Sequence, residues 1–383
     1  MMQPLESNRA GIIVKQLTGY GAFIPHKIYA KGLNVKLDSE CIKLLSEADR
    51  ALGELKGMTE TLPDPDLFIA YYVRKEALLS SQIEGTQCSL DEVLQIDEKT
   101  DELKPVQEVI NYINAMNQGL ELLKNIPMSL RLIHDIHKTL LKGVRGKHKS
   151  PGEYKRQQNW IGPPGCQLSE AIFVPPPPQS MIELMGDWEN YYHKHKSLPP
   201  LIEAAILHAQ FETIHPYVDG NGRLGRLLIT FMLCEKEVLD KPLLYLSLFF
   251  KSRRDDYYNL LMDFRFKGAV EEWMKFFLQG VRDTSREAIN TAKDICSLQS
   301  KHLGLIKEKL AKYRMSYKLY DLICESPIIS ISLATKKLGS SYPTIKQTFK
   351  NFIDIGILEP YGERERKQLF VYQEYLTILR RGT

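Results

Sequence analysis

Apolar residues at helical spacing run through almost the whole chain and constrain its fold more than any other feature. Residues 38–56 are one example, with an apolar face that follows an N-cap at Asp38 or Ser39 and a predicted stop at Gly57. The same spacing predicts further helices at 65–81, 105–124, 128–143, 179–195, 199–214, 222–237, 252–265, 268–294 and 299–312. The fold class is therefore predicted to be mainly α, a helical bundle.

Residues 150–178 break this helical pattern. Two short pieces with strand character, around Asn159–Ile161 and Ile172–Val174, flank a segment rich in Gly and Pro, which predicts a β-hairpin that stands out from the helical body. Four prolines at 175–178 would stiffen the exit from the hairpin because they donate no ladder hydrogen bonds. A plain surface loop is the alternative interpretation.

The C-terminal residues are predicted to form a separate unit. A short helix at Ile331–Leu338 ends at Gly339, and a longer helix follows at Ser341–Ile355. Alternating strands are expected at Ile357–Tyr361 and Leu369–Tyr372. The order helix, turn, helix and hairpin is typical of a winged-helix domain.

Composition limits the setting in which the chain works. The hydrophobic fraction of 43% and the charged fraction of 26% are ordinary for a globular protein. No apolar run reaches the roughly 18 residues of a membrane span, and the N-terminus lacks a secretory signal, so no membrane partner and a cytoplasmic location are expected. The six cysteines are widely scattered, which favours isolated reduced thiols over disulfides or a zinc site.

One loop between two predicted helices carries chemistry, in the segment His215–Arg226. Pro216 interrupts the first helix, and Gly220 and Gly222 can adopt positive φ. Such a loop exposes successive backbone N–H groups and leads directly into a helix N-terminus, where the helix dipole favours an anion. Asn221 lies between the two glycines.

The charged residues of this segment indicate what the anion is. Arg223 and Arg226 share one face of the first helical turn and suit phosphate oxygens. Asp219 is a hard oxygen ligand suited to Mg²⁺ between phosphates, and His215 is a natural proton acceptor near neutral pH. Together they predict transfer of part of a nucleoside triphosphate onto a hydroxyl group, without the Lys-Ser/Thr of a Walker A loop.

The twelve residues of His215–Arg226 resemble the signature of the Fic family, H-x-F-x-[DE]-G-N-G-R-x-x-R, with Tyr217 in the place of the usual Phe. The resemblance extends to the family's inhibitory motif [ST]-x-x-x-E-[GN], present as Ser80, Glu84 and Gly85. It also covers a target-docking flap and a C-terminal winged helix. The division that it implies is an N-terminal region with the inhibitory helix at 1–104, a catalytic core at 105–295, and a linker helix with a winged helix at 296–383.

The resemblance implies a protein adenylyltransferase that uses ATP and Mg²⁺. His215 would take the proton from a Ser, Thr or Tyr hydroxyl of a target protein, and AMP would move to that oxygen. The resemblance assigns Mg²⁺ to Asp219 and the γ-phosphate to Arg226. The remaining phosphate contacts fall on the anion-hole residues and the first arginine, which are Gly220, Asn221, Gly222 and Arg223. Tyr257 and Tyr258 are candidates for the adenine pocket, and core packing is the alternative for each.

The resemblance further implies that Glu84 pairs with Arg226, removes the partner of the γ-phosphate and leaves the enzyme autoinhibited. The target would add as an extended strand to the hairpin near 159–174.

Other functions stay open. The same fold could remove AMP, with Glu84 positioning a water, or transfer another nucleotide or phosphate group. A regulator that binds DNA through residues 313–383 is the alternative from another class, since this basic end holds 15 Lys and Arg against 8 Asp and Glu over residues 301–383. Its phosphate contacts would come from Lys346, Lys350, Arg364, Arg366 and Lys367. A winged helix can equally bind protein or form a homodimer.

Overall fold

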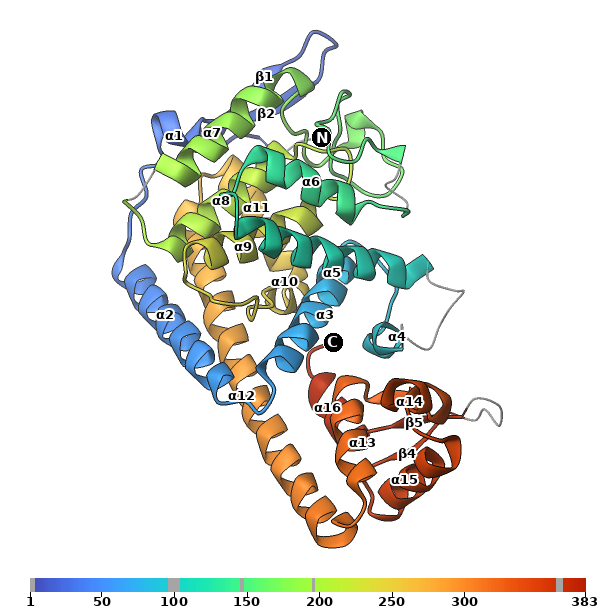
Figure 1. Ribbon diagram of the computed structural model, residues 1–383. Coiled ribbons are helices and arrows are strands. Elements are labelled where there is room, and N and C mark those ends of the chain that lie inside the picture. Colours follow the sequence, from blue (N-terminus) through green and yellow to red (C-terminus); the bar gives the residue numbers. More distant parts are fainter. Residues whose placement is uncertain (1–3, 96–103, 145–147, 195–196, 363–367) are drawn as a thin grey trace.

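The computed structural model of the protein describes residues 4–95, 104–144, 148–194, 197–362 and 368–383. Helices dominate this part of the chain, which confirms the predicted mainly α fold (Figure 1). Strands occur in a hairpin near the N-terminus and in a three-stranded sheet near the C-terminus. The first-half elements are β1 (Gly11–Lys15), β2 (Gly21–Pro25), α1 (Ile28–Lys31), α2 (Ser39–Glu60), α3 (Pro65–Ile83), α4 (Leu90–Leu94), α5 (Lys104–Leu123) and α6 (Leu130–Leu140).

The second half continues the helical body and adds the C-terminal unit. Its first elements are the 3-10 helices η3 (Leu168–Glu170) and η4 (Pro178–Ser180) and the helices α7 (Met181–Lys194), α8 (Pro200–Ile214), α9 (Asn221–Glu235), α10 (Ser247–Ser252), α11 (Arg254–Phe266) and α12 (Val270–Leu310). The C-terminal unit then contains α13 (Arg314–Glu325), β3 (Ile328–Ser330), α14 (Ile331–Leu338), α15 (Tyr342–Asp354), β4 (Glu359–Tyr361), β5 (Leu369–Val371) and α16 (Gln373–Leu379).

Helix α8 lies at the centre of the body, and α9 packs against it. Every α8 residue from Leu201 to Ile214 is buried, as expected for a helix surrounded on all sides by protein. His208 is 1% exposed, and its ring nitrogens contact the Gly225 carbonyl at 3.1 Å and the Tyr257 hydroxyl at 2.9 Å. This buried pair of helices provides a rigid base for the loop that connects them.

The predicted helix stop at Gly57 was wrong. Helix α2 starts after the N-cap Asp38, whose side chain accepts from the Cys41 N–H, but it continues beyond Gly57 to Glu60. An interior Gly costs a helix only about 1 kcal/mol, and the buried Leu55 and Thr59 on either side of it offset that cost.

The helices predicted at 268–294 and 299–312 are one continuous helix, α12, because the buried Leu298 and His302 keep it packed. The predicted domain boundary between residues 295 and 296 therefore lies inside α12 and stays a prediction.

The N-terminal hairpin of β1 and β2 was not predicted, and it supports the flap. Strand β2 donates from Phe23 N to the Val174 carbonyl at 2.9 Å, and the Phe23 and Phe173 ring centroids lie 5.9 Å apart. The flap at 154–178 is smaller than the predicted hairpin, with one antiparallel bridge between Ile161 and Phe173. The prolines on both sides of this bridge remove the donors that a longer ladder would need.

The C-terminal unit has helices and a hairpin in the predicted order, together with an unpredicted strand, β3, and an unpredicted final helix, α16. Strand β3 pairs antiparallel with β5, and β5 pairs with β4, which gives the sheet order β3-β5-β4. Helix α14 ends where predicted, at Gly339, which has the left-handed φ of 59°.

The predicted DNA-facing residues of this unit are only partly described. Lys346 and Lys350 are exposed on α15, whereas Phe349 on the same helix is buried. Ile353, also on α15, is 36% exposed. Arg364, Arg366 and Lys367 lie outside the described residues.

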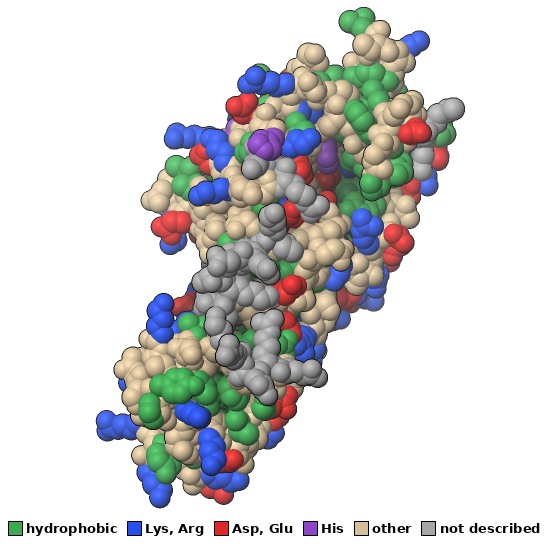
Figure 2. All heavy atoms as spheres, turned by 90° about the vertical axis from the view of Figure 1, so that its right-hand side faces the viewer, with side chains coloured by type: hydrophobic (Ala, Val, Ile, Leu, Met, Phe, Trp, Pro, Cys, Tyr) green, Lys and Arg blue, Asp and Glu red, His purple; other side chains and the backbone are tan. Residues whose placement is uncertain are grey.

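The molecule is elongated, with the C-terminal unit at one end (Figure 1). Helix α12 packs along α2 and then reaches the C-terminal unit, whose visible face carries many Lys and Arg side chains (Figure 2). Among the described residues, no helix combines the length and the apolar character needed to cross a bilayer.

Candidate active site

The motif loop (residues 215–222) connects the end of α8 to the start of α9. His215 is the C-cap of α8 in the left-handed region, with φ 49° and ψ 60°, and its N–H donates to the Phe211 carbonyl at 2.9 Å. Gly220, with φ 79°, is the N-cap of α9 and can adopt this conformation without strain. These two left-handed residues turn the chain tightly enough to bring the catalytic candidate next to the helix N-terminus.

Asn221 closes the motif loop from within. Its Oδ1 accepts from Tyr217 N at 2.9 Å, and its Nδ2 donates to the Tyr217 carbonyl at 2.8 Å. Asn221 is 2% exposed, so both bonds are shielded from water. The structure therefore gives this asparagine a role in loop geometry, in addition to the phosphate contact expected from the sequence.

Two flap residues that the sequence analysis missed hold the same loop from outside. Asn159 Nδ2 donates to the Tyr217 carbonyl at 2.9 Å and to the His215 carbonyl at 3.3 Å. Lys155 Nζ donates to the His215 carbonyl at 3.0 Å, and burial lowers the pKa of this amine to about 7. Nothing in the sequence marks a lysine as buried, so these contacts were visible only in the fold.

Tyr217 anchors the loop in the body through a pair of histidines on α6. Its ring stacks on His137 with centroids 3.8 Å apart, and its hydroxyl contacts His134 Nδ1 at 3.0 Å. Gly152 N donates to His137 Nδ1 at 2.8 Å, so His137 Nε2 carries the proton that it donates to the Asp219 carbonyl at 2.9 Å. Burial lowers the pKa of His137 to about 4, which keeps this arrangement neutral.

His215 can serve as a proton acceptor at neutral pH. Its side chain is one-fifth exposed, and burial lowers the pKa of its imidazole below the ordinary value. The nearest carboxylate oxygen belongs to Glu212, 4.0 Å from His215 Nδ1, and burial raises the pKa of Glu212 to about 7. A neutral imidazole that still reaches solvent has the protonation state that a general base needs.

The start of α9 forms a cradle for an anion. No side chain caps this helix, and Asp219 Oδ1 accepts from Gly220 N at 2.6 Å. Arg223 is 5% exposed, yet within the described residues its Nε and Nη1 have no hydrogen-bond partner. Its nearest carboxylates are Glu108 at 3.6 Å and Asp219 at 3.7 Å. Buried donors without acceptors are costly, so the cradle fits a ligand with phosphate oxygens.

The second arginine of the motif is bonded through Nε and Nη2 to the Glu84 turn (residues 80–86), at the end of α3. Arg226 Nε donates to Ser80 Oγ at 2.8 Å, and its Nη2 donates to the Ser80 carbonyl at 2.9 Å. Nη2 also donates to Glu84 Oε1 at 2.7 Å, which is the predicted ion pair. Gly85, with φ 88°, follows Glu84 and lets the chain turn away from the helix.

The Glu84 carboxylate also reaches the cradle. A Cβ atom at Gly222 would lie 2.2 Å from Glu84 Oε1 and 3.2 Å from Arg226 Nη1. Any side chain at position 222 would therefore collide with this carboxylate. The carboxylate thus lies where the α9 N-terminus would receive an anion.

The residues that could hold Mg²⁺ are few. Within the described part of the chain, no group of three or more His, Cys, Asp or Glu side chains could hold a metal ion. The Asp219 carboxylate is 41% exposed and lies beside the cradle. A single carboxylate suits Mg²⁺, which commonly binds one or two carboxylates together with substrate phosphates.

The sequence of the chain matches two adjacent family descriptions. Residues 42–121 match the Fic/DOC family N-terminal region, and residues 127–233 match the Fic/DOC family. The second match contains the whole motif loop, the cradle and both arginines.

The chain belongs to the Fic/DOC family.

Two similar curated proteins are named as protein adenylyltransferases. The probable protein adenylyltransferase aq_aa38 of Aquifex aeolicus (strain VF5) is 31% identical over 179 residues, which covers 45% of this chain and 51% of the relative. The protein adenylyltransferase Fic of Drosophila mojavensis is 26% identical over 236 residues, which covers 59% of this chain and 42% of the relative. The chain thus spans about half the length of these curated relatives.

Solved structures show the same fold. A Fic family protein from Desulfovibrio desulfuricans G20 has a TM-score of 0.60 at 22% identity, and the match covers 88% of this chain and 97% of that protein. A Fic domain containing signaling protein from Bacteroides thetaiotaomicron has a TM-score of 0.51 at 19% identity, with 64% and 97% covered.

Some site residues lie inside the Fic/DOC matches and others outside. The Glu84 turn lies within the N-terminal match. Tyr257 and Tyr258 on α11 follow both matches. Tyr257 is 1% exposed and packs on Phe250 with centroids 4.5 Å apart, whereas Tyr258 is half-buried below the Arg254 guanidinium. Of the two tyrosines, only Tyr258 has a surface that a ligand could reach.

Proposed function

We propose that this chain is a protein adenylyltransferase that transfers AMP from ATP to a Ser, Thr or Tyr hydroxyl of a target protein. The supporting observation is the pairing of a neutral, partly exposed His215 with the anion cradle of α9 and the unpartnered nitrogens of Arg223. A proton acceptor beside phosphate donors suits attack of a hydroxyl on a phosphoryl group. The named relatives have this activity in their names.

In the proposed reaction, the target hydroxyl donates its proton to His215 as its oxygen attacks the α-phosphorus of ATP. A bond forms between that oxygen and the α-phosphorus, and the bond from the α-phosphorus to the bridging oxygen breaks. Pyrophosphate leaves, and AMP stays on the target. The backbone N–H groups from Gly220 to Gly222 and the Arg223 guanidinium stabilise the negative charge. Mg²⁺, when bound by Asp219, neutralises charge on the phosphates.

The proposal includes autoinhibition by Glu84. Arg226 is the donor that would hold the γ-phosphate, and its Nε and Nη2 are already bonded to Ser80 and Glu84. ATP would then bind without its γ-phosphate partner and in an unproductive pose. Removal of the Glu84 carboxylate would free Arg226, so the wild-type chain is expected to be nearly silent and a Glu84 variant active.

The test is labelling with [α-³²P]ATP. Glu84→Gly should label itself, and wild type and the double variant Glu84→Gly with His215→Ala should not. Gln87→Gly, which places a glycine at an exposed position next to the same turn, is the matched control and should behave like wild type. Mass spectrometry should find the increment of AMP. An increment of phosphate, or release of AMP from an adenylylated protein, would contradict the proposed reaction and favour the alternatives on this fold.

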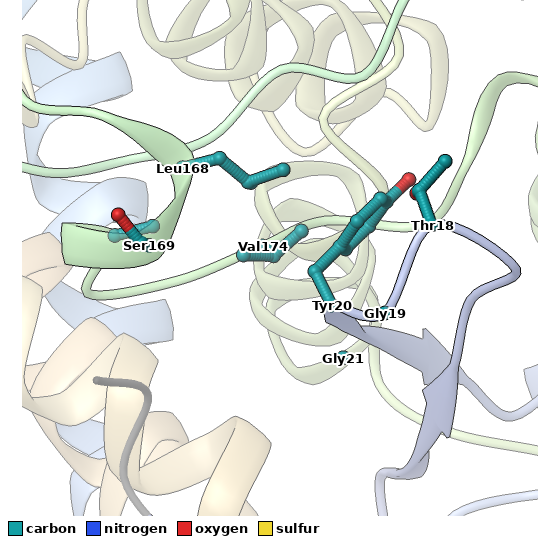
Figure 3. Close-up of a pocket in the computed structure, with 8 residues that line it drawn as sticks. Thr18, Gly19, Tyr20, Gly21, Leu168, Ser169 and Val174 are labelled. Atoms are coloured by element: carbon teal, nitrogen blue, oxygen red, sulfur yellow. The ribbon is translucent and has the colours of Figure 1, made fainter.

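The flap is the proposed docking surface for the target, near residues 159–174. Trp160 and Ile172 are 40% and 46% exposed on either side of its single bridge, as a surface that adds an extended strand would be. A cavity of about 510 Å³ lies between the flap and the N-terminal hairpin, with Tyr20 and Leu168 on opposite walls (Figure 3). Among the residues that the structure describes, no charged side chain lines this cavity, so it suits an apolar target side chain.

Filling the cavity tests the docking surface. Ser169→Trp in the Glu84→Gly background should lower labelling of a peptide library with one central Ser, Thr or Tyr, and self-labelling should stay. Arg156→Trp, at an exposed flap position outside the cavity, is the control. Equal peptide labelling by both variants would contradict this docking mode.

DNA binding by the C-terminal unit is a weaker candidate. The exposed Lys346 and Lys350 on α15 favour it, because adjacent basic side chains on one helix can contact phosphates. A salt-dependent gel shift of the full chain with generic duplex DNA, lost in Lys346→Ala with Lys350→Ala, would support it. A homodimer and a cytoplasmic location stay predictions.

A further inference from the structure

Residues 380–383, called the C-terminal tail below, are bonded to the segment that carries Glu84. Arg380 Nε donates to Asp91 Oδ1 at 2.8 Å, Arg380 Nη2 donates to Asp91 Oδ2, and the Tyr361 hydroxyl donates to Asp91 Oδ2 at 2.6 Å. Burial raises the pKa of the Asp91 carboxyl, but these hydrogen bonds outweigh burial, and the net pKa lies below the ordinary value. Asp91 lies on α4, seven residues after Glu84, and is thus held from two parts of the C-terminal unit.

A second attachment lies on α3, nine residues before Glu84. Lys75 Nζ donates to the Arg381 carbonyl, and the Lys75 side chain is 2% exposed. The nearest carboxylate oxygen, on Glu287 of α12, is 4.0 Å away. The Arg381 side chain itself pairs with Asp294 on α12. The carbonyl of the C-terminal tail is therefore a main acceptor for a fully buried amine.

The tail also packs on the body. A Cβ atom at Gly382, which has φ 76°, would lie 2.6 Å from Leu248 Cδ1 on α10. Figure 1 shows the C-terminus beside α3. Since α10 also packs on α3, the C-terminal tail is closely packed against the helical body.

We propose that the C-terminal unit is a clamp that keeps Glu84 on Arg226, and that displacing this unit releases the inhibited site. The clamp consists of the Asp91–Arg380–Tyr361 cluster and the Lys75–Arg381 contact, which lie on either side of Glu84 in the sequence. This inference rests on the proposed adenylyltransferase function.

The balance of contacts supports a clamp. Glu84 itself makes one ion pair with the buried Arg226, and its side chain is 35% exposed, so its position depends on that single contact. The segment between the two attachments cannot move far from α9 while both attachments hold. Because both attachments come from residues near the C-terminus, anything that moves the C-terminal unit acts on Glu84 without touching it.

The test compares self-labelling by full-length variants with [α-³²P]ATP. Asp91→Ala and Arg380→Ala should each raise the rate about five- to tenfold over wild type, towards that of Glu84→Gly. The charge swap, Asp91→Arg with Arg380→Asp, should return the rate towards wild type because it restores the pair. Lys301→Ala, which breaks an exposed pair with Glu374 in the same unit, is the control and should leave the rate unchanged.

A structural readout separates the clamp from the proposed function. Hydrogen exchange of the amides at residues 80–94 should accelerate in Asp91→Ala and Arg380→Ala but not in Lys301→Ala. If Glu84→Gly is activated and the Asp91 and Arg380 variants stay at the wild-type rate, the clamp is wrong. If no variant labels, Glu84→Gly included, the proposed function fails. In that case the hydrogen-exchange rates alone test the clamp. Unchanged exchange in Asp91→Ala and Arg380→Ala overturns it, and faster exchange supports it.

Discussion

The motif loop and the Glu84 turn meet at Arg226, but they are held in very different ways. The loop has bonds from Asn221 within it and from Lys155 and Asn159 outside it, all to backbone carbonyls or amides. The turn places a one-third-exposed carboxylate on Arg226 through one ion pair. The loop is thus fixed by redundant contacts, whereas the Glu84 carboxylate of the turn depends on a single ion pair. We infer that the motif loop serves catalysis and that the Glu84 turn serves regulation of the site.

The largest effect is expected from the loop. In the Glu84→Gly background, His215→Ala should lower the rate of AMP transfer by about 10²- to 10⁴-fold, the usual contribution of a general base. Rates would be measured with [α-³²P]ATP under single-turnover conditions. ATP binding, followed by calorimetry, should be nearly unchanged. A variant that keeps more than a tenth of the rate would show that the loop does not supply the base.

The next effect concerns the pH dependence of folding. Burial lowers the pKa of His208 to about 3, so the unfolded chain binds one more proton than the folded chain below the ordinary pKa of about 6.5. The contribution of His208 to the free energy of unfolding should therefore be fully present above a pH of about 6.5 and be lost as the pH is lowered below it. The contribution of His208 is about 2 kcal/mol between pH 6.5 and 5.

Urea unfolding at both pH values measures this contribution. His208→Gln should lose about that much less stability on acidification than wild type, although it is less stable at pH 7. The exposed His148 gives a control, since His148→Gln should lose as much stability as wild type when the pH is lowered. Equal slopes for all three proteins would exclude the buried neutral histidine under the loop as a source of acid sensitivity.

A smaller effect is expected where the flap holds the loop. Asn159→Ala removes two donors to loop carbonyls and should cost about 1–2 kcal/mol of stability, with a roughly tenfold lower rate in the Glu84→Gly background. Thermal unfolding and labelling would measure both. Arg156→Ala, three residues away and exposed, should change neither. An unaltered rate in Asn159→Ala would mean that the loop keeps its geometry without the flap.

The smallest effect is expected from the turn. Ser80→Ala removes the acceptor of Arg226 Nε and should raise self-labelling of the otherwise wild-type chain about two- to fivefold, since one hydrogen bond contributes about 0.5–1 kcal/mol. Ser81 is the matched control, because its buried Oγ has no hydrogen-bond partner within the described residues. If Ser81→Ala raises labelling equally, the effect belongs to packing of α3 and not to release of Arg226.

Much of the helical body could be predicted because its order comes from local periodicity. Helix α14 and its glycine C-cap occur at the predicted residues for this reason. The hairpin of β1 and β2 was missed because its strands are short and take their stability from packing on the flap through Phe23. Helix α12 was predicted as two helices because the packing that keeps it continuous, at Leu298 and His302, is tertiary.

The residues of the candidate site also differ in how far the sequence could predict them. The residues from His215 to Arg226 are contiguous, so their placement together in one loop and the following helix could be predicted from one segment. Glu84 could be predicted only from the family resemblance, because a glutamate at a helix end is otherwise an ordinary surface residue. Lys155 had no signal at all, since its burial depends on where the flap folds.

The Glu84 carboxylate above Gly222 has a further consequence. Because the Glu84 carboxylate belongs to the same chain as the cradle that it enters, under the proposed inhibition it would act as a tethered competitor whose effective concentration is set by geometry. Dilution of the protein cannot weaken such a competitor. The degree of inhibition by Glu84 should therefore be the same at any protein concentration, unlike inhibition that depends on a second molecule.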